Sequence, residues 1–278
     1  MASAPSFLQL ASHPRLRLLH RLPTIATVDR FLSPSECDAL VSKARNHLVR
    51  QTHDDHGGSA RTSKGCVLRD EEVPSLRKRF AALAGVGLSQ CQPLKVSRYC
   101  SGERFDCHTD AIRGDLRGGE LEADDWFADR RRARHGVPGA PFPGVNRIAT
   151  IFVYLNTVAR GGRTRWRWLD YDACEGGSHG RDFYAQPGPG AGRTDVARGS
   201  GGEVAVAPEQ GLAVVHLPAM LPSAGGYTDY NAFHESEPAV DEKWVAQQFI
   251  WSHPNLDWRR VLDRENWEPP ARRSHETI

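Results

Sequence analysis

The fold is decided by the stretch RIATIFVYLN, residues Arg147–Asn156, an almost unbroken run of aliphatic, aromatic and β-branched residues. A run of this composition and length is typical of a buried strand. Similar short runs lie on both sides of it, separated by loops rich in glycine and proline: Leu94–Cys100, Thr164–Leu169, Val204–Ala207, Leu212–Leu217 and Trp244–Trp251. Several short strands broken by such loops predict an all-β sandwich or barrel core.

Two helices are expected before these strands. Ser33 can cap the first, and Glu36, three residues later, completes a capping box. Its apolar face repeats at helical spacing through Cys37, Leu40, Val41, Ala44 and Leu48. The second helix is expected over residues 72–84, with the stripe Leu76, Phe80 and Leu83 and with Gly85 as its stop. The predicted fold class is therefore mainly β with flanking α-helices.

Composition narrows the class of protein. The chain has 278 residues, with 36 Lys plus Arg against 34 Asp plus Glu, a net charge of +2. A chain with so small a net charge has no large excess of positive charge to attract a nucleic acid or a membrane surface, so neither is expected as a partner. No apolar stretch approaches the roughly 18 residues of a membrane-spanning helix. The six cysteines form no CxxC pair, so reduced thiols are expected.

The first residues of the chain and two long loops give weaker indications of location and function. Residues 1–28 contain no Asp or Glu but also no continuous apolar signal segment, so a cytoplasmic location is expected, with organelle import as the alternative. The loop 111–145 has an acidic and then a basic patch, which indicates a solvated segment. The loop 171–203 is rich in glycine and proline, and loops of this length often serve as lids or binding loops.

The strongest chemical signal is the sequence His108-Thr109-Asp110 together with His234. In a strand, residues i and i+2 point to the same face, so one segment can direct an imidazole and a carboxylate to one point. A second histidine from a distant strand then completes a facial triad of two histidines and one carboxylate. That set suits Fe(II), because it leaves coordination positions open for a cosubstrate and dioxygen.

Two rival positions are weaker. The sequence His53-Asp54-Asp55 repeats the pattern, but it lies in a polar stretch without strand alternation and is interpreted as a solvated loop. His216 lies in the apolar run Leu212–Leu217 and is interpreted as a core or wall histidine whose hydrogen bonds are satisfied.

Lys243 opens the apolar run that ends at Trp251. A buried lysine needs an anionic partner, and the distal carboxylate of 2-oxoglutarate is the anion that a facial-triad iron site would supply. The alternative is that the side chain reaches solvent at the strand edge.

In these residues the chain resembles the prolyl 4-hydroxylase-type 2-oxoglutarate and Fe(II)-dependent dioxygenases, over roughly residues 22–253. The segments that carry the resemblance occur in order: residues 23–37, Arg61-Thr62-Ser63-Lys64-Gly65, Arg98-Tyr99-Cys100-Ser101-Gly102 leading to His108 and Asp110, Arg147 to Asn156 with Gly161-Gly162, residues 204–213, and His234, Pro238, Lys243 and Trp244. The chain departs from the family in having Arg163 where an acidic residue is usual, in a His-to-Lys spacing shorter by one residue, and in both long loops.

The resemblance implies a double-stranded β-helix, or jelly-roll, with iron bound by His108, Asp110 and His234. It also implies that Lys243 pairs with the C5 carboxylate of 2-oxoglutarate and that Tyr99 hydrogen-bonds this cosubstrate. Dioxygen is the second cosubstrate and ascorbate an additional cofactor. Candidate substrate-binding residues are Arg61, Arg163 and Trp166. Asp110 argues against a halogenase, in which a small residue would stand there.

The implied activity is hydroxylation of an unactivated C–H bond with release of succinate and CO2. A prolyl residue in a peptide or protein is the expected substrate, and a free amino acid or other small molecule is the alternative. A catalytically silent jelly-roll that binds peptides is the non-enzyme alternative, and a nucleic-acid demethylase is disfavoured by the charge. The expected organisation is an arm over 1–21, a dioxygenase domain over 22–253 and a tail over 254–278. Within the domain, 30–92 would give helical support and 93–253 the jelly-roll core.

Overall fold

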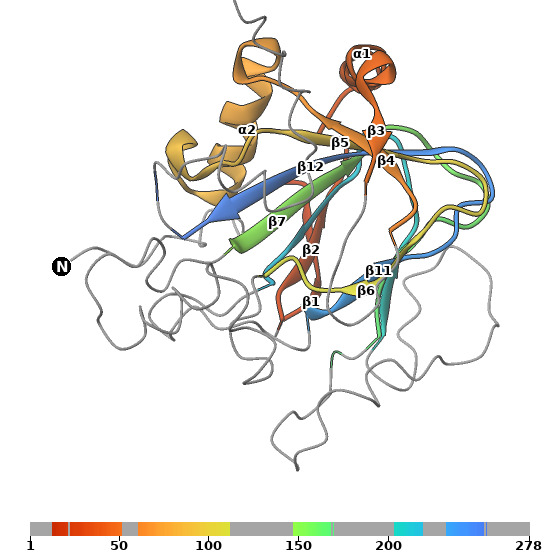
Figure 1. The fold of residues 1–278 in the computed structure, drawn as a ribbon. Coiled ribbons are helices and arrows are strands. Elements are labelled where there is room, and N and C mark those ends of the chain that lie inside the picture. The colour runs from red at the N-terminus through yellow and green to blue at the C-terminus, as the bar shows by residue number, and fades with distance from the viewer. Residues whose placement is uncertain are drawn as a thin grey trace, which may run out of the picture.

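The computed structural model describes residues 13–21, 23–51, 61–111, 147–167, 169, 203–218, 232–252 and 254. Within them the chain forms two antiparallel sheets and two α-helices (Figure 1). The predicted loops 111–145 and 171–203, the His53 segment and the tail beyond residue 254 lie almost entirely outside this part of the chain.

The larger sheet has eight strands in the described residues, in the order β1-β2-β10-β7-β12-β5-β4-β3. Their bounds are β1 Leu16–His20, β2 Ile25–Val28, β3 Val49–Arg50, β4 Lys64–Val67, β5 Lys95–Tyr99, β7 Arg147–Tyr154, β10 Ala213–His216 and β12 Lys243–Trp251. The fold-deciding stretch is therefore β7, which lies between β10 and β12 near the middle of this sheet.

The smaller sheet has four strands in the described residues, in the order β6-β11-β8-β9. Their bounds are β6 Phe105–His108, β11 His234–Ser236, β8 Thr164–Trp166 and β9 Val204–Val206. From β5 to β12 the chain crosses repeatedly from one sheet to the other, interrupted by the β8–β9 hairpin. Two antiparallel sheets connected in this way form a jelly-roll, so the predicted fold class is confirmed.

Both helices begin and end close to where the sequence places them. Helix α1, Pro34–Ala44, has the predicted capping box: the Glu36 amide donates to Oγ of Ser33, and the Ser33 amide donates to Oε2 of Glu36. Helix α2, Pro74–Ala84, follows a 3-10 turn over Asp70–Glu72, and it therefore starts two residues later than predicted. Gly85 ends it with a left-handed φ of 68°, which glycine adopts without strain.

The residues of the larger sheet alternate between two apolar cores. On β12, Trp244, Ala246 and Ile250 join the core beneath the helices, which cover the outer face of this sheet (Figure 1). Val245 joins a second core between the two sheets, which also contains Phe152 and Trp166. Side chains on the same face of the larger sheet as Val245 therefore point toward the smaller sheet.

Several short strands were not predicted. The segment expected to be an arm contains β1, which pairs with β2, and the expected helical support contains β3 and β4, which extend the sheet beyond β5. No helix in the described part of the chain is long and apolar enough to span a membrane. Within the described residues, no disulfide joins any two of the cysteines Cys37, Cys66, Cys91, Cys100 and Cys107.

Candidate metal centre

The structure brings His108, Asp110 and His234 together. Strands β6 and β11 are antiparallel neighbours, and His108 and His234 stand opposite each other in their register, with ring centroids 4.4 Å apart. Asp110 lies two residues beyond the end of β6, with Oδ1 3.6 Å from Nε2 of His108 and Oδ2 3.7 Å from Nε2 of His234. One possible ligand atom from each residue lies within 4.8 Å of the others, and all three side chains are buried.

Backbone carbonyl groups orient both imidazoles. Nδ1 of His108 lies 2.8 Å from the carbonyl oxygen of Asp106, and Nδ1 of His234 lies 3.2 Å from that of Ala232. A carbonyl oxygen can only accept, so each Nδ1 carries the proton and donates it. Each Nε2 is then left with a lone pair on the side of Asp110, which is the arrangement seen in metal-binding histidines.

The surroundings of His234 and Asp110 shift their pKa values toward the protonation states that bind a metal. Burial and the neighbouring His108 hold the pKa of His234 well below its usual value, although Asp110 acts in the opposite direction. Burial works to raise the pKa of Asp110, but the three histidines around it outweigh this effect and place that pKa well below the ordinary range. His234 is therefore neutral and Asp110 ionised near neutral pH, as metal binding requires.

The donor set fits a ferrous ion. Oδ2 of Asp110 is buried and makes no hydrogen bond in the described part of the chain. An ionised oxygen in that situation is costly unless it meets a cation. Two imidazoles and one carboxylate arranged on one side form the donor set that non-haem iron takes.

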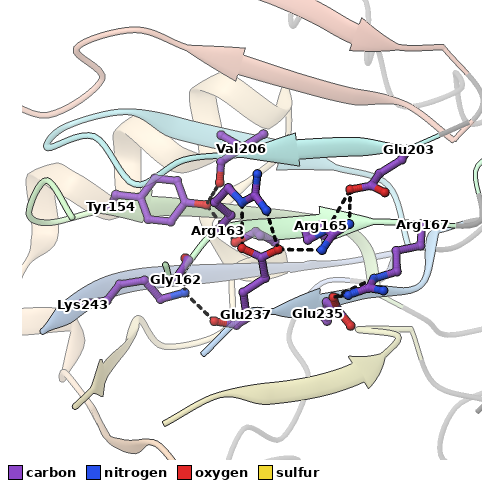
Figure 2. A network of polar contacts seen from close by, with 12 residues as sticks. Tyr154, Gly162, Arg163, Arg165, Arg167, Glu203, Val206, Glu235, Glu237 and Lys243 are labelled. Atoms are coloured by element: carbon purple, nitrogen blue, oxygen red, sulfur yellow. Dashed lines mark hydrogen bonds and ion pairs between the residues drawn. The ribbon is translucent and has the colours of Figure 1, made fainter. Parts of the chain in front are cut away.

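Lys243 opens β12 and is only 1% exposed. Its Nζ donates to the carbonyl oxygen of Gly162, at 2.8 Å (Figure 2). It also donates to Oγ of Ser236, at 2.5 Å, and lies 4.6 Å from the ring centroid of Tyr99. Both acceptors are neutral, and in the described part of the chain no carboxylate lies within ion-pair distance of this ammonium group. Burial lowers the pKa of Lys243 to about 7, with Glu237 opposing the shift. The solvent-exposed alternative is therefore wrong.

Tyr99 and the Gly161-Gly162 turn shape the surroundings of this lysine. Tyr99 pairs with Lys243 in the register of β5 and β12 and is buried beside it. Gly162 has a φ of 68°, and a Cβ built on it would lie 3.2 Å from Cδ of Lys243. A side chain at this position would therefore be strained and would also press on the lysine.

His216 differs from its prediction. It is fully buried, as expected for a core histidine, but neither ring nitrogen makes a hydrogen bond within the described residues. Instead, Nε2 lies 3.2 Å from Oδ2 of Asp110, and the ring lies 4.5 Å from that of His234. On β10, His216 lies two residues after Val214 and therefore on the same face, toward the core between the sheets. This alternation along the strand was the sequence signal that could have placed His216 near the site.

The three candidate substrate residues lie in different surroundings. Trp166 is fully buried on β8, and its ring stacks on that of His234 with centroids 5.5 Å apart. Arg61 is also buried; Nε donates to Ser63 and Nη2 to Ser97. Arg163 instead donates through Nε and Nη2 to both carboxylate oxygens of Glu237, at 2.7 and 2.9 Å (Figure 2).

Comparison with known proteins finds similarity to prolyl 4-hydroxylases. No protein-family model matches the chain. The probable prolyl 4-hydroxylase 3 of Arabidopsis thaliana is 28% identical over 151 residues, which cover 51% of this chain and 45% of that protein. Prolyl 4-hydroxylase 2 of the same plant is 24% identical over 260 residues, 90% of this chain and 74% of that protein.

The match to the first of these relatives thus spans less than half of that relative's length. Among solved structures, a truncated form of the viral collagen prolyl hydroxylase vCPH from Paramecium Bursaria Chlorella virus-1 superposes with a TM-score of 0.50 at 17% identity, covering 82% of this chain and 90% of that one. This likeness supports the jelly-roll fold. The chain is thus similar in sequence to prolyl 4-hydroxylases, and its fold is similar to that of the viral collagen prolyl hydroxylase.

Proposed function

We propose that the chain is an Fe(II)- and 2-oxoglutarate-dependent dioxygenase that hydroxylates an unactivated C–H bond, with a prolyl residue of a peptide or protein as its substrate. The observation that carries the proposal is the buried group of His108, Asp110 and His234 in the same sheet sandwich as Lys243, a buried lysine with only neutral partners. The prolyl 4-hydroxylase relatives support the same activity.

In this proposal, Fe(II) held by both Nε2 atoms and a carboxylate oxygen of Asp110 would supply the activation of dioxygen. The overall reaction balances as R–H plus 2-oxoglutarate plus O2 giving R–OH, succinate and CO2. The chain positions and shields the reactants. Lys243 would hold the C5 carboxylate of 2-oxoglutarate by a charge-assisted hydrogen bond, with the ring of Tyr99 beside it.

A second candidate substrate is a free amino acid or another small acid. One observation favours it: the side chain of Lys95, a further buried lysine, faces the same space between the sheets and could pair with the carboxylate of such a substrate.

Anaerobic titration with Fe(II) and then 2-oxoglutarate tests the proposal. We expect a visible metal-to-ligand absorption band and, after oxygen is admitted with a proline-containing peptide, release of succinate. Ascorbate, which we add as an activator, is tested by omission from the same assay. His234→Ala should abolish the band and lower turnover by at least about 10³-fold, because one ligand of three is lost.

His47→Ala is the matched control, since His47 is an exposed histidine in a turn after α1. It should leave both signals unchanged. If the unmodified chain gives neither the band nor succinate, the silent peptide-binding alternative is favoured instead.

A further inference from the structure

Asp110 is the one proposed metal ligand that lies outside the strands. His108 and His234 belong to β6 and β11 and stand opposite each other in their register. Asp110 follows the end of β6 by two residues, and no strand in the described part of the chain pairs with it. A metal-binding group must be held to within about 0.5 Å of its working position. The backbone of Asp110 therefore needs support from outside the sheet.

Arg147, the first residue of β7, supplies such support. Its Nη1 donates to the backbone oxygen of Asp110, at 3.2 Å. The two residues are 37 positions apart in the sequence and lie close to the two ends of the connection from β6 to β7. The hydrogen bond therefore joins the start of this connection to its end, at the residue whose carboxylate faces both site histidines.

The guanidinium of Arg147 is itself held in place. Its Nη2 donates to Oε1 of Gln92, at 3.3 Å. Its Cζ lies 3.9 Å from the ring centroid of Phe249 and 5.2 Å from that of Trp251, both of which are buried on β12. Trp251 stands opposite Arg147 in the register of β12 and β7, and its Nε1 donates to the same oxygen of Gln92, at 2.9 Å. Packing against rings together with hydrogen bonds fixes the rotamer of such a side chain.

Gln92 connects this group to the middle of the larger sheet. It is fully buried, and its backbone amide donates to the carbonyl oxygen of Phe249, at 3.0 Å. Its own carbonyl oxygen accepts from Nε2 of Gln248. Both partners belong to β12, which lies between β7 and β5. The support of Asp110 thus runs through Arg147 and Gln92 to a central strand.

We propose that Arg147 is a positioning residue for the metal: by binding the backbone oxygen of Asp110, it holds the carboxylate of that residue toward His108 and His234. This inference rests on the metal centre of the proposed function and adds a residue that is not among its three ligands. Electrostatics alone predicts the opposite effect, because a guanidinium repels a divalent cation. Weaker metal binding after the loss of Arg147 therefore reports the geometry of Asp110 and not the charge.

Titration of the whole chain with Mn(II), without substrate or 2-oxoglutarate, tests the proposal. Arg147→Met keeps an apolar side chain over the rings but removes both donors. It should weaken Mn(II) binding by about 10–100-fold, the usual effect of losing an outer-shell partner. Arg147→Lys keeps a donor and should recover part of this affinity. Co(II) is a second probe, because its visible d–d bands report the arrangement of the ligands, and Arg147→Met should change them.

Arg79→Met is the matched control. Arg79 lies on α2, and it too has its Cζ near a ring, 5.0 Å from the centroid of Phe31, and donates to a backbone oxygen, that of Phe31. Its replacement should lower the melting temperature and leave the Mn(II) affinity and the Co(II) spectrum unchanged. Gln92→Met removes the acceptor of Arg147 but leaves the arginine in place, and it should weaken Mn(II) binding by a smaller factor. Circular dichroism shows which variants are folded, so that the test does not depend on Arg147→Met alone.

The failure of this inference can be told from a failure of the proposed function. If folded Arg147→Met binds Mn(II) as tightly as the unmodified chain, or more tightly as electrostatics predicts, the positioning role is wrong while the metal centre stands. Unchanged Mn(II) affinity with reduced turnover would likewise overturn it and would place Arg147 in contact with the substrate instead. An unmodified chain that binds neither Mn(II) nor Co(II) would overturn both the proposed function and this inference.

Discussion

Single backbone carbonyls hold the two site histidines in the form that binds a metal. Asp106 and Ala232 accept a hydrogen bond from Nδ1 of His108 and His234, so that both Nε2 atoms face the carboxylate of Asp110. His216 has no such carbonyl partner in the described residues, and its Nε2 lies 3.2 Å from Oδ2 of Asp110. The two atoms form no hydrogen bond in this structure, but an imidazole N–H this close could donate to Oδ2 and so fix the carboxylate for a metal on its other oxygen.

His216 should therefore strengthen metal binding without being a ligand. We expect His216→Leu to weaken Mn(II) or Fe(II) binding by about 10–100-fold, the usual effect of losing an outer-shell partner. His216→Gln keeps an N–H donor and should retain most of the affinity. Trp166, which stacks on His234, is a suitable fluorescent reporter for the titration. Equal affinities for the leucine variant and the unmodified chain would contradict this role.

Lys243 should take up a proton when 2-oxoglutarate binds. Its pKa of about 7 lies below its usual value of 10.5, so in the unliganded chain it is largely neutral at pH 8. Pairing with a carboxylate favours the charged form. Calorimetry at pH 8 in buffers of different ionisation enthalpy should show uptake approaching one proton, and above pH 7 the affinity should fall by up to about tenfold per pH unit. Lys243→Arg, which stays charged, should bind without uptake, and an absence of buffer dependence in the unmodified chain would contradict the assignment.

The pKa of Lys243 also determines whether the free energy of unfolding of the unliganded chain rises or falls with pH. Between pH 7 and 10.5 the unfolded chain binds the Lys243 proton more strongly than the folded chain does. The contribution of Lys243 to the free energy of unfolding therefore rises with pH across this window and is smallest below it.

Strands β8 and β11 have different kinds of side chain on their two faces. Trp166 and His234 point to the sandwich interior, whereas Arg165 and Glu235, which pair in register, lie half-buried on the opposite face. There Glu237 accepts from both Arg163 and Arg165, Arg165 also donates to Glu203, and Arg167 pairs with Glu235 (Figure 2). This network joins β8 to β11 and to the start of β9, and so supports the strand that carries His234.

Glu237 is the centre of this network, and its loss should lower stability. Its side chain is 13% exposed and those of Arg163 and Arg165 are 17% and 19% exposed. We expect Glu237→Ala to lower the free energy of unfolding by about 2–3 kcal/mol, below the 3–5 kcal/mol of a fully buried pair because water still reaches this one. Asp241→Asn breaks the exposed pair with Arg160 and should change it by less than about 1 kcal/mol. Urea unfolding measures both.

The pH dependence of that network has a definite sign. Burial works to raise the pKa of Glu237, but Arg163 and Arg165 outweigh it and lower that pKa. Its contribution to stability is therefore present above the usual glutamate pKa of 4.5 and is lost as the pH falls through the lowered value. Equal stability losses for Glu237→Ala at pH 7 and pH 3 would contradict this.

The helices and strands that could be predicted from the sequence are those whose signal lies within one short segment of the chain. The capping box of α1 and the long apolar runs β7 and β12 can be recognised without knowledge of the fold. Strands β3 and β11 contain only two and three residues, and their stability comes from pairing with neighbours that the sequence does not identify. For the same reason the metal group could be proposed from motifs, whereas the unsatisfied His216 and the network around Glu237 depend on contacts between distant strands.

At the scale of the whole molecule, the site lies between the sheets and draws on both. His108 and His234 come from the smaller sheet, and Lys243, Tyr99 and His216 come from the larger one. Asp110 lies in the connection from β6 to β7, which crosses from one sheet to the other. A metal on the first group and a keto acid held by Lys243 would therefore link the two halves of the sandwich.

Binding should consequently stabilise the entire fold in two separable steps. A ligand that binds only the folded chain adds about 2.7 kcal/mol at 100 times its Kd, which corresponds to roughly 5–10 °C in Tm for a chain of this size. We expect Mn(II) to raise Tm and 2-oxoglutarate to raise it again once the metal is present, as followed by circular dichroism. Lys243→Met should keep the first step and lose the second, whereas His234→Ala should lose both. If 2-oxoglutarate stabilised Lys243→Met as much as the unmodified chain, the keto acid would not be held across the two sheets, and the assignment of Lys243 would be wrong.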